Sequence, residues 1–451
     1  MPHRTPAAGR HTARQAIAAV ADDFTELPSP ATPHPDNPLA WPGYDELRRQ
    51  AHERTGETES IVCGTATIGG SPAMLLSLEF GFLGGSLGVR TGDRIEAAHT
   101  AARERRLPLV TLIATGGSRL QEGMLALGQL QRIAAQSAMT RAAGLAQIAV
   151  ACDPTTGGGW ATLGAGADII LAEPSAQIGF AGSRVRPAGA DPAAYSAEAQ
   201  LAAGHIDAIV APEELAATLG RWLRLLRPPA DAAPADPPRA LGKTALPETG
   251  WQAVLHARDA ARPRARDYLR AYFDGGYEEI RGDRCGGVDD GMLCGFGLRG
   301  GRPIAFAAQC GTATRPAGFR TATRLLRMAS RLGIPILTLI DTPGASNDAE
   351  AERGGIGAAI AQTYAAVAEA RVPITSVVIG EGTSGGALAL AAPGNLWATP
   401  DSYFTVLAPE AAAAVLKRGA EGIAQTASDL KIRPQDLLKL GIIRGIVDSA
   451  D

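Results

Sequence analysis

The residues best suited to chemistry are glycines in two short loops of the first half of the chain. One loop contains Gly116 and Gly117, and the other contains Gly157 and Gly158. Each loop follows a short apolar run and precedes a stretch with helical periodicity. A strand, a glycine-rich turn and a helix together aim backbone N–H groups at an anionic or polarised oxygen. The pattern therefore predicts an oxyanion-binding site, although a single loop of this kind also occurs in plain turns.

The same pair of loops occurs again in the second half of the chain. Its members contain Gly344 and Ala345 in one loop and Gly385 and Gly386 in the other. Gly116 to Gly344 is a step of 228 residues, and Gly157 to Gly385 is the same step. A repeat of this length indicates a duplicated domain, because solenoid repeats are much shorter.

Strand and helix signals alternate around these loops. Apolar runs predict strands at 60–66, 73–78, 109–113, 147–151 and 169–172, and again at 291–298, 303–308, 334–340 and 374–379. A helix is predicted at 94–106, where Ile95, Ala98 and Ala102 share one face. Further helices are expected at 122–143, 160–167, 251–273, 319–332, 385–391, 408–419 and 432–440. Such alternation predicts parallel strands and an α/β fold.

Composition divides the chain into four parts. Residues 1–40 are rich in Pro and Ala and are predicted to be a mobile tail. Residues 227–247 have the same bias and are predicted to be a linker. Between and after these segments we expect one domain at 41–226 and a second at 248–451.

Size and charge limit the function classes. The chain has 451 residues, of which 45% are hydrophobic and 20% charged, as in ordinary globular proteins. Its formal net charge of −3 gives no reason to expect a nucleic-acid partner. No apolar run is long enough to span a membrane. No signal-peptide pattern is visible either, so a cytoplasmic location is expected.

Cysteine and histidine spacing gives no sign of a metal site. The five cysteines are widely spaced, without a C-x-x-C pair, and the seven histidines show no ligand spacing. Neither a disulfide framework nor a protein-bound metal is therefore predicted.

Other loop residues near the glycines are candidate ligand contacts. These are Gly84, Gly85, Ser118, Arg119, Phe180, Gly182 and Arg184. A close-packed turn for the glycines and a solvated loop face for the cation are the alternatives. Arg119, Glu122 and Glu381 also flank the loops, and we expect ion pairs that order the loops more often than ligand contact.

Several stretches match a known family closely. In the first half they are 78–88, 115–122, 153–158 and 172–182, and in the second half 282–284, 340–345, 351–354, 380–389 and 409–410. The first half resembles the β subunit of bacterial acetyl-CoA carboxylase carboxyltransferase, and the second half resembles its α subunit. The resemblance implies two tandem crotonase-like domains, each a ββα spiral of the ClpP/crotonase type, fused in one chain.

The resemblance also implies a reaction and a use for the loops. Such enzymes move a carboxyl group between carboxybiotin and the α-carbon of an acyl-CoA. Negative charge then develops on the thioester oxygen and on the ureido oxygen of biotin. Gly116, Gly117, Gly157 and Gly158 are assigned to the thioester oxygen, and Gly344, Ala345, Gly385 and Gly386 to the biotin oxygen. Biotin nitrogen is the expected base, consistent with the lack of a Ser-His-Asp pattern.

The implied partners follow from the same resemblance. Biotin is the cofactor, carried on a separate biotin carboxyl carrier protein and charged by a biotin carboxylase, because no Met-Lys-Met motif or ATP-grasp domain is found. A homodimer or higher homo-oligomer is expected, since related sites lie between domains of two protomers.

Two departures from the family leave alternatives open. The N-terminal zinc ribbon of the β subunit is replaced by the Pro-rich tail, and residues 310–319 form a shorter segment than the usual insert. The acceptor therefore stays open among acyl-CoA and acyl-carrier-protein thioesters. A malonyl-thioester decarboxylase, a non-catalytic scaffold, and a crotonase-type hydrolase using Glu122 or Glu381 are the competing hypotheses.

Overall fold

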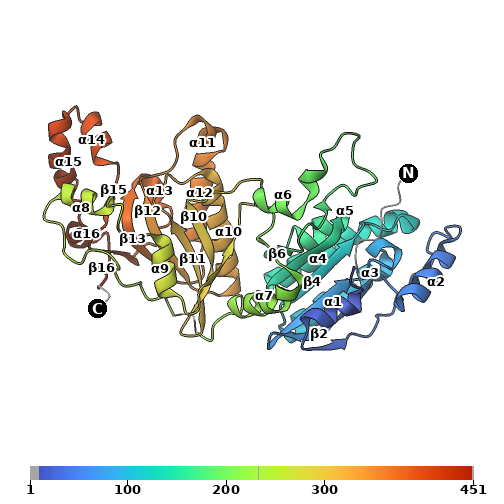
Figure 1. Cartoon of the computed structure of the whole chain (residues 1–451). Coiled ribbons are helices and arrows are strands. Elements are labelled where there is room, and N and C mark those ends of the chain that lie inside the picture. Colours follow the sequence, from blue (N-terminus) through green and yellow to red (C-terminus); the bar gives the residue numbers. More distant parts are fainter. Residues whose placement is uncertain (1–9, 232, 449–451) are drawn as a thin grey trace. The chain divides into compact units, whose positions relative to one another are not determined.

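The computed structural model describes residues 10–231 and 233–448, and the chain forms two compact units (Figure 1). The first unit ends at Arg224 and the second begins at Leu225. Each unit contains one eight-stranded sheet flanked by helices. No helix, among those described, is long and apolar enough to cross a membrane.

The sheet of the first unit has the order β1-β2-β3-β4-β5-β6-β8, with β7 paired to β5. Its strands are β1 (Asp23–Glu26), β2 (Ile61–Ile68), β3 (Ser71–Leu78), β4 (Leu109–Thr115), β5 (Gln147–Thr156), β6 (Ile169–Ala172), β7 (Ile178–Gly179) and β8 (Ala208–Ile209). The strands β1 to β3 are antiparallel, and all pairings from β3 onward are parallel.

The sheet of the second unit has the order β16-β14-β13-β12-β11-β10-β9, with β15 paired to β13. Its strands are β9 (Tyr277–Ile280), β10 (Met292–Arg299), β11 (Arg302–Gln309), β12 (Ile336–Thr342), β13 (Ile374–Thr383), β14 (Leu396–Ala398), β15 (Tyr403–Thr405) and β16 (Gly445–Ile446). The antiparallel strands β9 to β11 again precede a parallel set.

The helices lie between the strands as the alternation predicts. In the first unit they are α1 (Ala13–Val20), α2 (Tyr44–Thr55), α3 (Val89–Arg105), α4 (Gly123–Ala142), α5 (Gly157–Gly159), α6 (Ala197–Ala202) and α7 (Pro212–Leu225). In the second they are α8 (Gly250–Ala257), α9 (Ala265–Tyr272), α10 (Pro316–Leu332), α11 (Ala349–Arg353), α12 (Ile356–Ala368), α13 (Ser384–Leu388), α14 (Pro409–Val415), α15 (Ile423–Asp429) and α16 (Pro434–Lys439). Together with the two sheets, this order confirms the predicted tandem α/β fold.

The central strands of both sheets are buried along their whole length. Every residue of β4 and of β12 is buried, as expected for parallel strands covered on both faces. The predicted face of α3 is confirmed, since Ile95, Ala98 and Ala102 are fully buried against this core. These strands are rigid supports for the loops that follow them.

The internal repeat has a slightly different step from the one that the glycines indicate. In the first sheet Leu109 pairs with Gln147, and in the second sheet Ile336 pairs with Ile374. From 109 to 336 and from 147 to 374 the step is 227 residues, not 228. The predicted step is therefore wrong by one residue at the loops, because it matched glycines by identity instead of by backbone position.

The predicted mobile tail is wrong for part of its length. Helix α1 starts with a capping box at Thr12 and buries Ala13, Ile17 and Val20. The strand β1 then adds an edge to the sheet by pairing with β2. An apolar helix face and an open sheet edge therefore order this segment despite its composition. Residues 1–9 of the predicted tail lie outside the described residues.

The predicted linker joins the two units without regular structure of its own. No helix or strand is present among the described residues of 226–249. Ala235 and Ala240 are nevertheless buried in the core of the second unit. The segment therefore follows the surface of that unit and is held to it by small apolar contacts.

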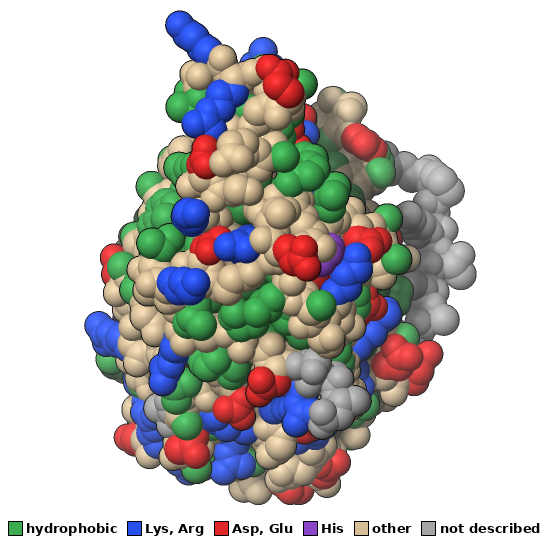
Figure 2. Space-filling model, turned by 90° about the vertical axis from the view of Figure 1, so that its left-hand side faces the viewer, with side chains coloured by type: hydrophobic (Ala, Val, Ile, Leu, Met, Phe, Trp, Pro, Cys, Tyr) green, Lys and Arg blue, Asp and Glu red, His purple; other side chains and the backbone are tan. Residues whose placement is uncertain are grey.

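Charges on the surface are mixed. On the face shown in Figure 2, basic and acidic side chains are interspersed with apolar ones. The five cysteines are all free thiols, and no group of His, Cys, Asp and Glu able to hold a metal ion is found in the described part of the chain.

A buried histidine between α3 and α4 should make the stability depend on pH. His99 is 2% exposed, and its Nδ1 lies 2.9 Å from Oγ1 of Thr140. Burial, and then the charge of Arg103, lower the pKa of His99 to about 4. Because this folded pKa lies below the unfolded value near 6.5, the neutral ring stabilises the fold above pH 6.5. That stability is lost as the pH falls toward 4.

We expect acidification from pH 7.5 to 5 to cost about 2 kcal/mol of unfolding free energy through His99 alone. Urea unfolding at the two pH values measures the loss. The His99→Gln variant is the control, because it keeps polar contacts and removes the titration. An equal loss in both proteins would contradict the assignment to His99.

Candidate oxyanion-binding sites

In the first unit, the loop after β4 touches the start of α5. Gly117 has a φ of +106°, and a Cβ atom placed on it would lie 3.4 Å from Cα of Gly157. A Cβ atom on Gly157, which has a φ of +66°, would lie 3.0 Å from Cα of Gly117. The two backbones are therefore in direct contact, and glycine is required on both sides.

Most of the N–H groups predicted to bind the oxyanion already have acceptors inside the protein. The hydrogen bonds run from Gly116 N–H to the Gly84 carbonyl (2.9 Å), from Gly117 N–H to Thr115 Oγ1 (3.0 Å) and from Gly157 N–H to the Phe180 carbonyl (3.1 Å). The assignment of these three glycines as donors is wrong. They shape the two loops instead, since each bond fixes the turn that its residue belongs to.

Two other N–H groups of the same loops are open. Neither Ser118 N–H nor Gly158 N–H has an acceptor within the described residues. Gly158 belongs to the first turn of α5, where N–H groups have no partner inside the helix. The Gly158 nitrogen is 3.6 Å from the Cβ position of Gly117, so it faces the loop after β4. Ser118 and Gly158 are thus the donors that this site offers.

The second unit repeats this geometry after β12 and β13. Gly344 has a φ of +131°, and its N–H is bound by Thr342 Oγ1 (3.1 Å), as Gly117 N–H is bound by Thr115. At the start of α13, Ser384 has a φ of +64° and occupies the place of Gly157. Both matches have the step of 227 residues. The prediction of a Gly344 donor is therefore wrong for the same reason as that of Gly117.

The open donors of the second unit agree with the other predicted positions. Ala345, Gly385 and Gly386 have N–H groups without an acceptor in the part of the chain that the structure describes. A Cβ atom on Gly386 would lie 2.4 Å from the Ala345 nitrogen, so the two loops touch here as well. The side chain of Gln309 supports them by donating to the Gly386 carbonyl (3.0 Å).

The predicted substrate contact of Arg119 is wrong. Its side chain is fully buried and is paired with Glu59 and Glu122. Gly85 is also not a ligand contact, because a Cβ atom there would lie 2.0 Å from the Ala114 carbonyl oxygen. These residues have the alternative roles that the sequence left open, an ordering ion pair and a close-packed turn. Gly84 serves the loop through its carbonyl.

The loop after β7 lies against the start of α5. The Phe180 side chain is 75% exposed, while its carbonyl holds Gly157. A Cβ atom on Gly182 would lie 3.5 Å from Oγ1 of Thr156. Arg184 is exposed on the same loop. The structure thus brings Phe180 and Gly182 to the first site and leaves Arg184 facing solvent.

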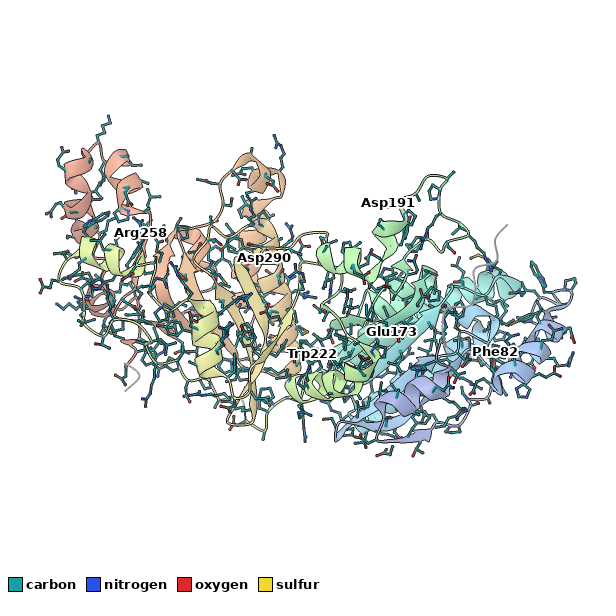
Figure 3. The ribbon with its side chains drawn as sticks, in the orientation of Figure 1. Phe82, Glu173, Asp191, Trp222, Arg258 and Asp290 are labelled. Atoms are coloured by element: carbon teal, nitrogen blue, oxygen red, sulfur yellow. The ribbon has the colours of Figure 1, made fainter. Side chains whose placement is uncertain are left out.

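Neither glutamate beside the loops is free to act as a general base. Glu122 is 3% exposed and accepts hydrogen bonds from Val89 N–H (2.6 Å) and from Tyr44 Oη (2.5 Å). Glu381 accepts hydrogen bonds from Tyr403 Oη (2.7 Å) and from Arg258 Nε (2.8 Å), and Arg258 is labelled in Figure 3. These pairings argue against the hydrolase hypothesis, which needs an available carboxylate.

The fold and the two loop pairs define a two-domain carboxyltransferase of the crotonase-like superfamily. Residues 245–450 match the family model described as acetyl co-enzyme A carboxylase carboxyltransferase-like. A relative from Saccharopolyspora erythraea, acetyl-coenzyme A carboxylase carboxyl transferase subunits beta/alpha, is 38% identical over 90% of this chain and 74% of its own length. One from Salinispora arenicola with the same description is 36% identical over 98% of this chain and 83% of its own. The chain therefore belongs to the acetyl-coenzyme A carboxylase carboxyl transferase beta/alpha family.

Solved structures agree on the fold. The chain is similar to the transcarboxylase 12S structure with methylmalonyl-coenzyme A bound, with a TM-score of 0.79 and 22% identity, over 98% of this chain and 87% of that one. It is also similar to a single-chain, multi-domain long-chain acyl-CoA carboxylase, with a TM-score of 0.77 and 19% identity, over 97% of this chain and 45% of that one. At these identities the likeness concerns the fold alone.

Proposed function

We propose that this carboxyltransferase moves a carboxyl group between biotin on a carrier protein and the α-carbon of an acyl-CoA. The observation that carries the proposal is the presence of two similar sets of open N–H groups, one in each unit. A reaction with charge developing on two separate oxygens needs two such sets. The names of the relatives support the same reaction.

The first set suits the thioester oxygen. Loss of a proton or of CO2 from the α-carbon gives an enolate, whose oxygen would accept from Ser118 and Gly158 N–H. These donors sit on loops held by buried strands, so they need little reorganisation as charge develops. One donor of this kind is typically worth about 3 to 4 kcal/mol of barrier.

The second set suits the ureido oxygen of biotin. Biotin, when bound, supplies the transferred carboxyl group and a basic nitrogen. The N–H groups of Ala345, Gly385 and Gly386 would hold the ureido oxygen while negative charge is present on it. No titratable side chain is required in either set, consistent with the pairing of Glu122 and Glu381 inside the protein.

Mass spectrometry of thioester products tests the proposal. The purified protein is incubated with malonyl-CoA or methylmalonyl-CoA, with and without free biotin or a biotinylated carrier. Biotin-dependent loss of the carboxyl group is the expected result, and the ratio of the two rates gives the acyl preference. Loss without biotin would indicate a decarboxylase instead, and no loss with either thioester would favour the scaffold hypothesis.

The partners belong to the same proposal. A biotin carboxyl carrier protein and a biotin carboxylase would supply charged biotin, and the description of one relative as a subunit of a biotin-dependent carboxylase supports this. A cytoplasmic location is also part of the proposal, because five free thiols suit a reducing compartment.

We expect a homo-oligomer in solution. The transcarboxylase 12S structure is described as a hexamer assembly, and the surface of each unit keeps large apolar side chains exposed. Examples are Leu120 and Met124 in the first unit, at 80% and 75% exposure. Sedimentation equilibrium of the purified protein measures the mass. A monomer with full transfer activity would contradict this expectation.

A further inference from the structure

Each proposed oxyanion site lies directly above a buried group of paired charges. The Arg119 cluster consists of Arg119, Glu59, Glu122 and Tyr44, in the first unit. The Arg262 cluster consists of Arg262, Arg264 and Asp341, in the second unit. We infer that these clusters are separate positioning devices, each holding the N–H donors of one site in place. The inference rests on the proposed function for its kinetic consequences, but not for its structural ones.

The Arg119 guanidinium uses its donors entirely inside the protein. Nη1 lies 3.0 Å from Glu59 Oε2 and 3.2 Å from Glu122 Oε1, and Nη2 also bonds to Glu59. The ring of Phe82, labelled in Figure 3, lies 5.7 Å from the guanidinium carbon. Tyr44 Oη, on α2, donates to Glu122 at 2.5 Å and accepts from Nη1 at 3.2 Å. The cluster is therefore complete without a ligand.

The cluster connects every segment that frames the first site. Nη2 donates to the Ser86 carbonyl (2.7 Å), and Glu122 accepts from Val89 N–H, the first residue of α3. Arg119 itself directly follows Ser118, one of the two open donors. Movement of the guanidinium would therefore change the direction of the Ser118 N–H bond.

Charge makes this cluster sensitive to the loss of one member. Burial would raise the pKa of Glu59, but the Arg119 charge and hydrogen bonds outweigh it and hold that pKa at about 2. Glu59 is 1% exposed and stays ionised. Removing the arginine would leave buried carboxylates without a counter-charge, and the surrounding loops would rearrange to solvate them.

The Arg262 cluster connects the two strands that lead into the second site. Arg262 Nη2 donates to Asp341 Oδ1 at 2.5 Å, and Nη1 donates to the Ile379 carbonyl at 3.2 Å. Asp341 Oδ1 also accepts from Glu381 N–H at 3.1 Å, and Arg264 Nη1 donates to Oδ2 at 3.2 Å. The ends of β12 and β13 are thus joined immediately before the loops that carry Ala345 and Gly385.

The two clusters are not copies of each other. By the step of 227, Arg119 corresponds to Ser346, and Asp341 corresponds to Ala114. In the first unit the strand ends are joined instead by Thr155 Oγ1, which donates to the Ile113 carbonyl at 2.5 Å. Because the clusters lie at different places in the repeat, a substitution in one should leave the other site unaffected.

Hydrogen exchange of the full chain tests the positioning directly. Arg119→Met should speed exchange in peptides covering 114–123 but not in those covering 340–348, and Arg262→Met should do the reverse. The control is Arg132→Met, which breaks a half-exposed ion pair with Asp93 on the surface of the first unit. Faster exchange in both loops with either variant, or in neither loop, would overturn the inference, whether or not the protein transfers carboxyl groups.

Kinetics supply the second test. In transfer from malonyl-CoA to free biotin, each Met variant should lose about 100-fold in kcat, since its site loses aligned donors. Arg119→Lys and Arg262→Lys should recover part of the rate, because lysine keeps the charge but not the planar fork. They also replace the Met variants if those do not fold. A loss that only follows the folded fraction, measured by near-UV circular dichroism, would overturn the positioning role. Inactive wild-type protein would reject the proposed function alone.

Discussion

Gly117→Val should abolish carboxyl transfer while the first unit stays folded. A Cβ atom at this position would lie 3.4 Å from Cα of Gly157 and 3.6 Å from the Gly158 nitrogen. The valine methyl groups would extend further into this contact, separate the two loops and cover one open donor. We expect kcat to fall by about 10²- to 10³-fold, the usual cost of a lost oxyanion donor.

Strain at Gly117 should not be enough to unfold the unit. A branched residue at a φ of +106° costs on the order of 1–3 kcal/mol. That is less than the roughly 5–15 kcal/mol by which domains are usually stable. Transfer from malonyl-CoA to free biotin and thermal unfolding are measured on the same sample. Gly128→Ala is the control, since Gly128 lies on α4 with nothing within 4 Å of its Cβ position. Wild-type turnover of Gly117→Val would reject this loop as part of the site.

The architecture could be predicted because its signals are local. The strands β4 and β12 are continuous apolar runs, and each is followed within a few residues by glycines of the repeat. Burial on both faces selects such runs, so a reader of the sequence sees them directly. Helix α12 escaped prediction, because its alanine-rich sequence has little contrast between its faces.

The donors could not be predicted because hydrogen bonding depends on residues distant in sequence. Gly116 is occupied by a carbonyl at position 84, and Gly157 by one at position 180. Glycine content marks the turn, whereas the open N–H belongs to the neighbouring residue, Ser118 or Gly158. The role of Arg119 is hidden in the same way, since Glu59 lies 60 residues before it.

The step of the repeat shows a related limit. Ser384 has a φ of +64°, a conformation in which glycine is expected, and Gly157 has nearly the same value of +66°. Matching residue types therefore aligned Gly157 with Gly385, one position too far. Hydrogen-bond register in the sheets supplies the correct alignment, because it depends on backbone position and not on residue type.

Gly386→Val should stop the reaction at the second site. A Cβ atom at Gly386 would lie 2.4 Å from the Ala345 nitrogen and 2.9 Å from the Gly344 carbonyl carbon. Both atoms belong to the backbone, so relief requires a shift of one loop. Gly386 cannot easily move away, because Gln309 holds its carbonyl and is itself fully buried. The Ala345 loop should therefore be displaced together with its N–H group.

We expect this displacement to lower kcat for transfer to biotin by about 10²- to 10³-fold, as for loss of an oxyanion donor. Hydrogen exchange in peptides covering 114–123 should stay unchanged, because the first unit is not altered. Gly357→Ala is the control within the second unit, since the Cβ position of Gly357 on α12 has nothing within 4 Å. If Gly386→Val transfers at the wild-type rate, the second set of donors does not hold the ureido oxygen. The reaction would then need only the first site, as a decarboxylase does.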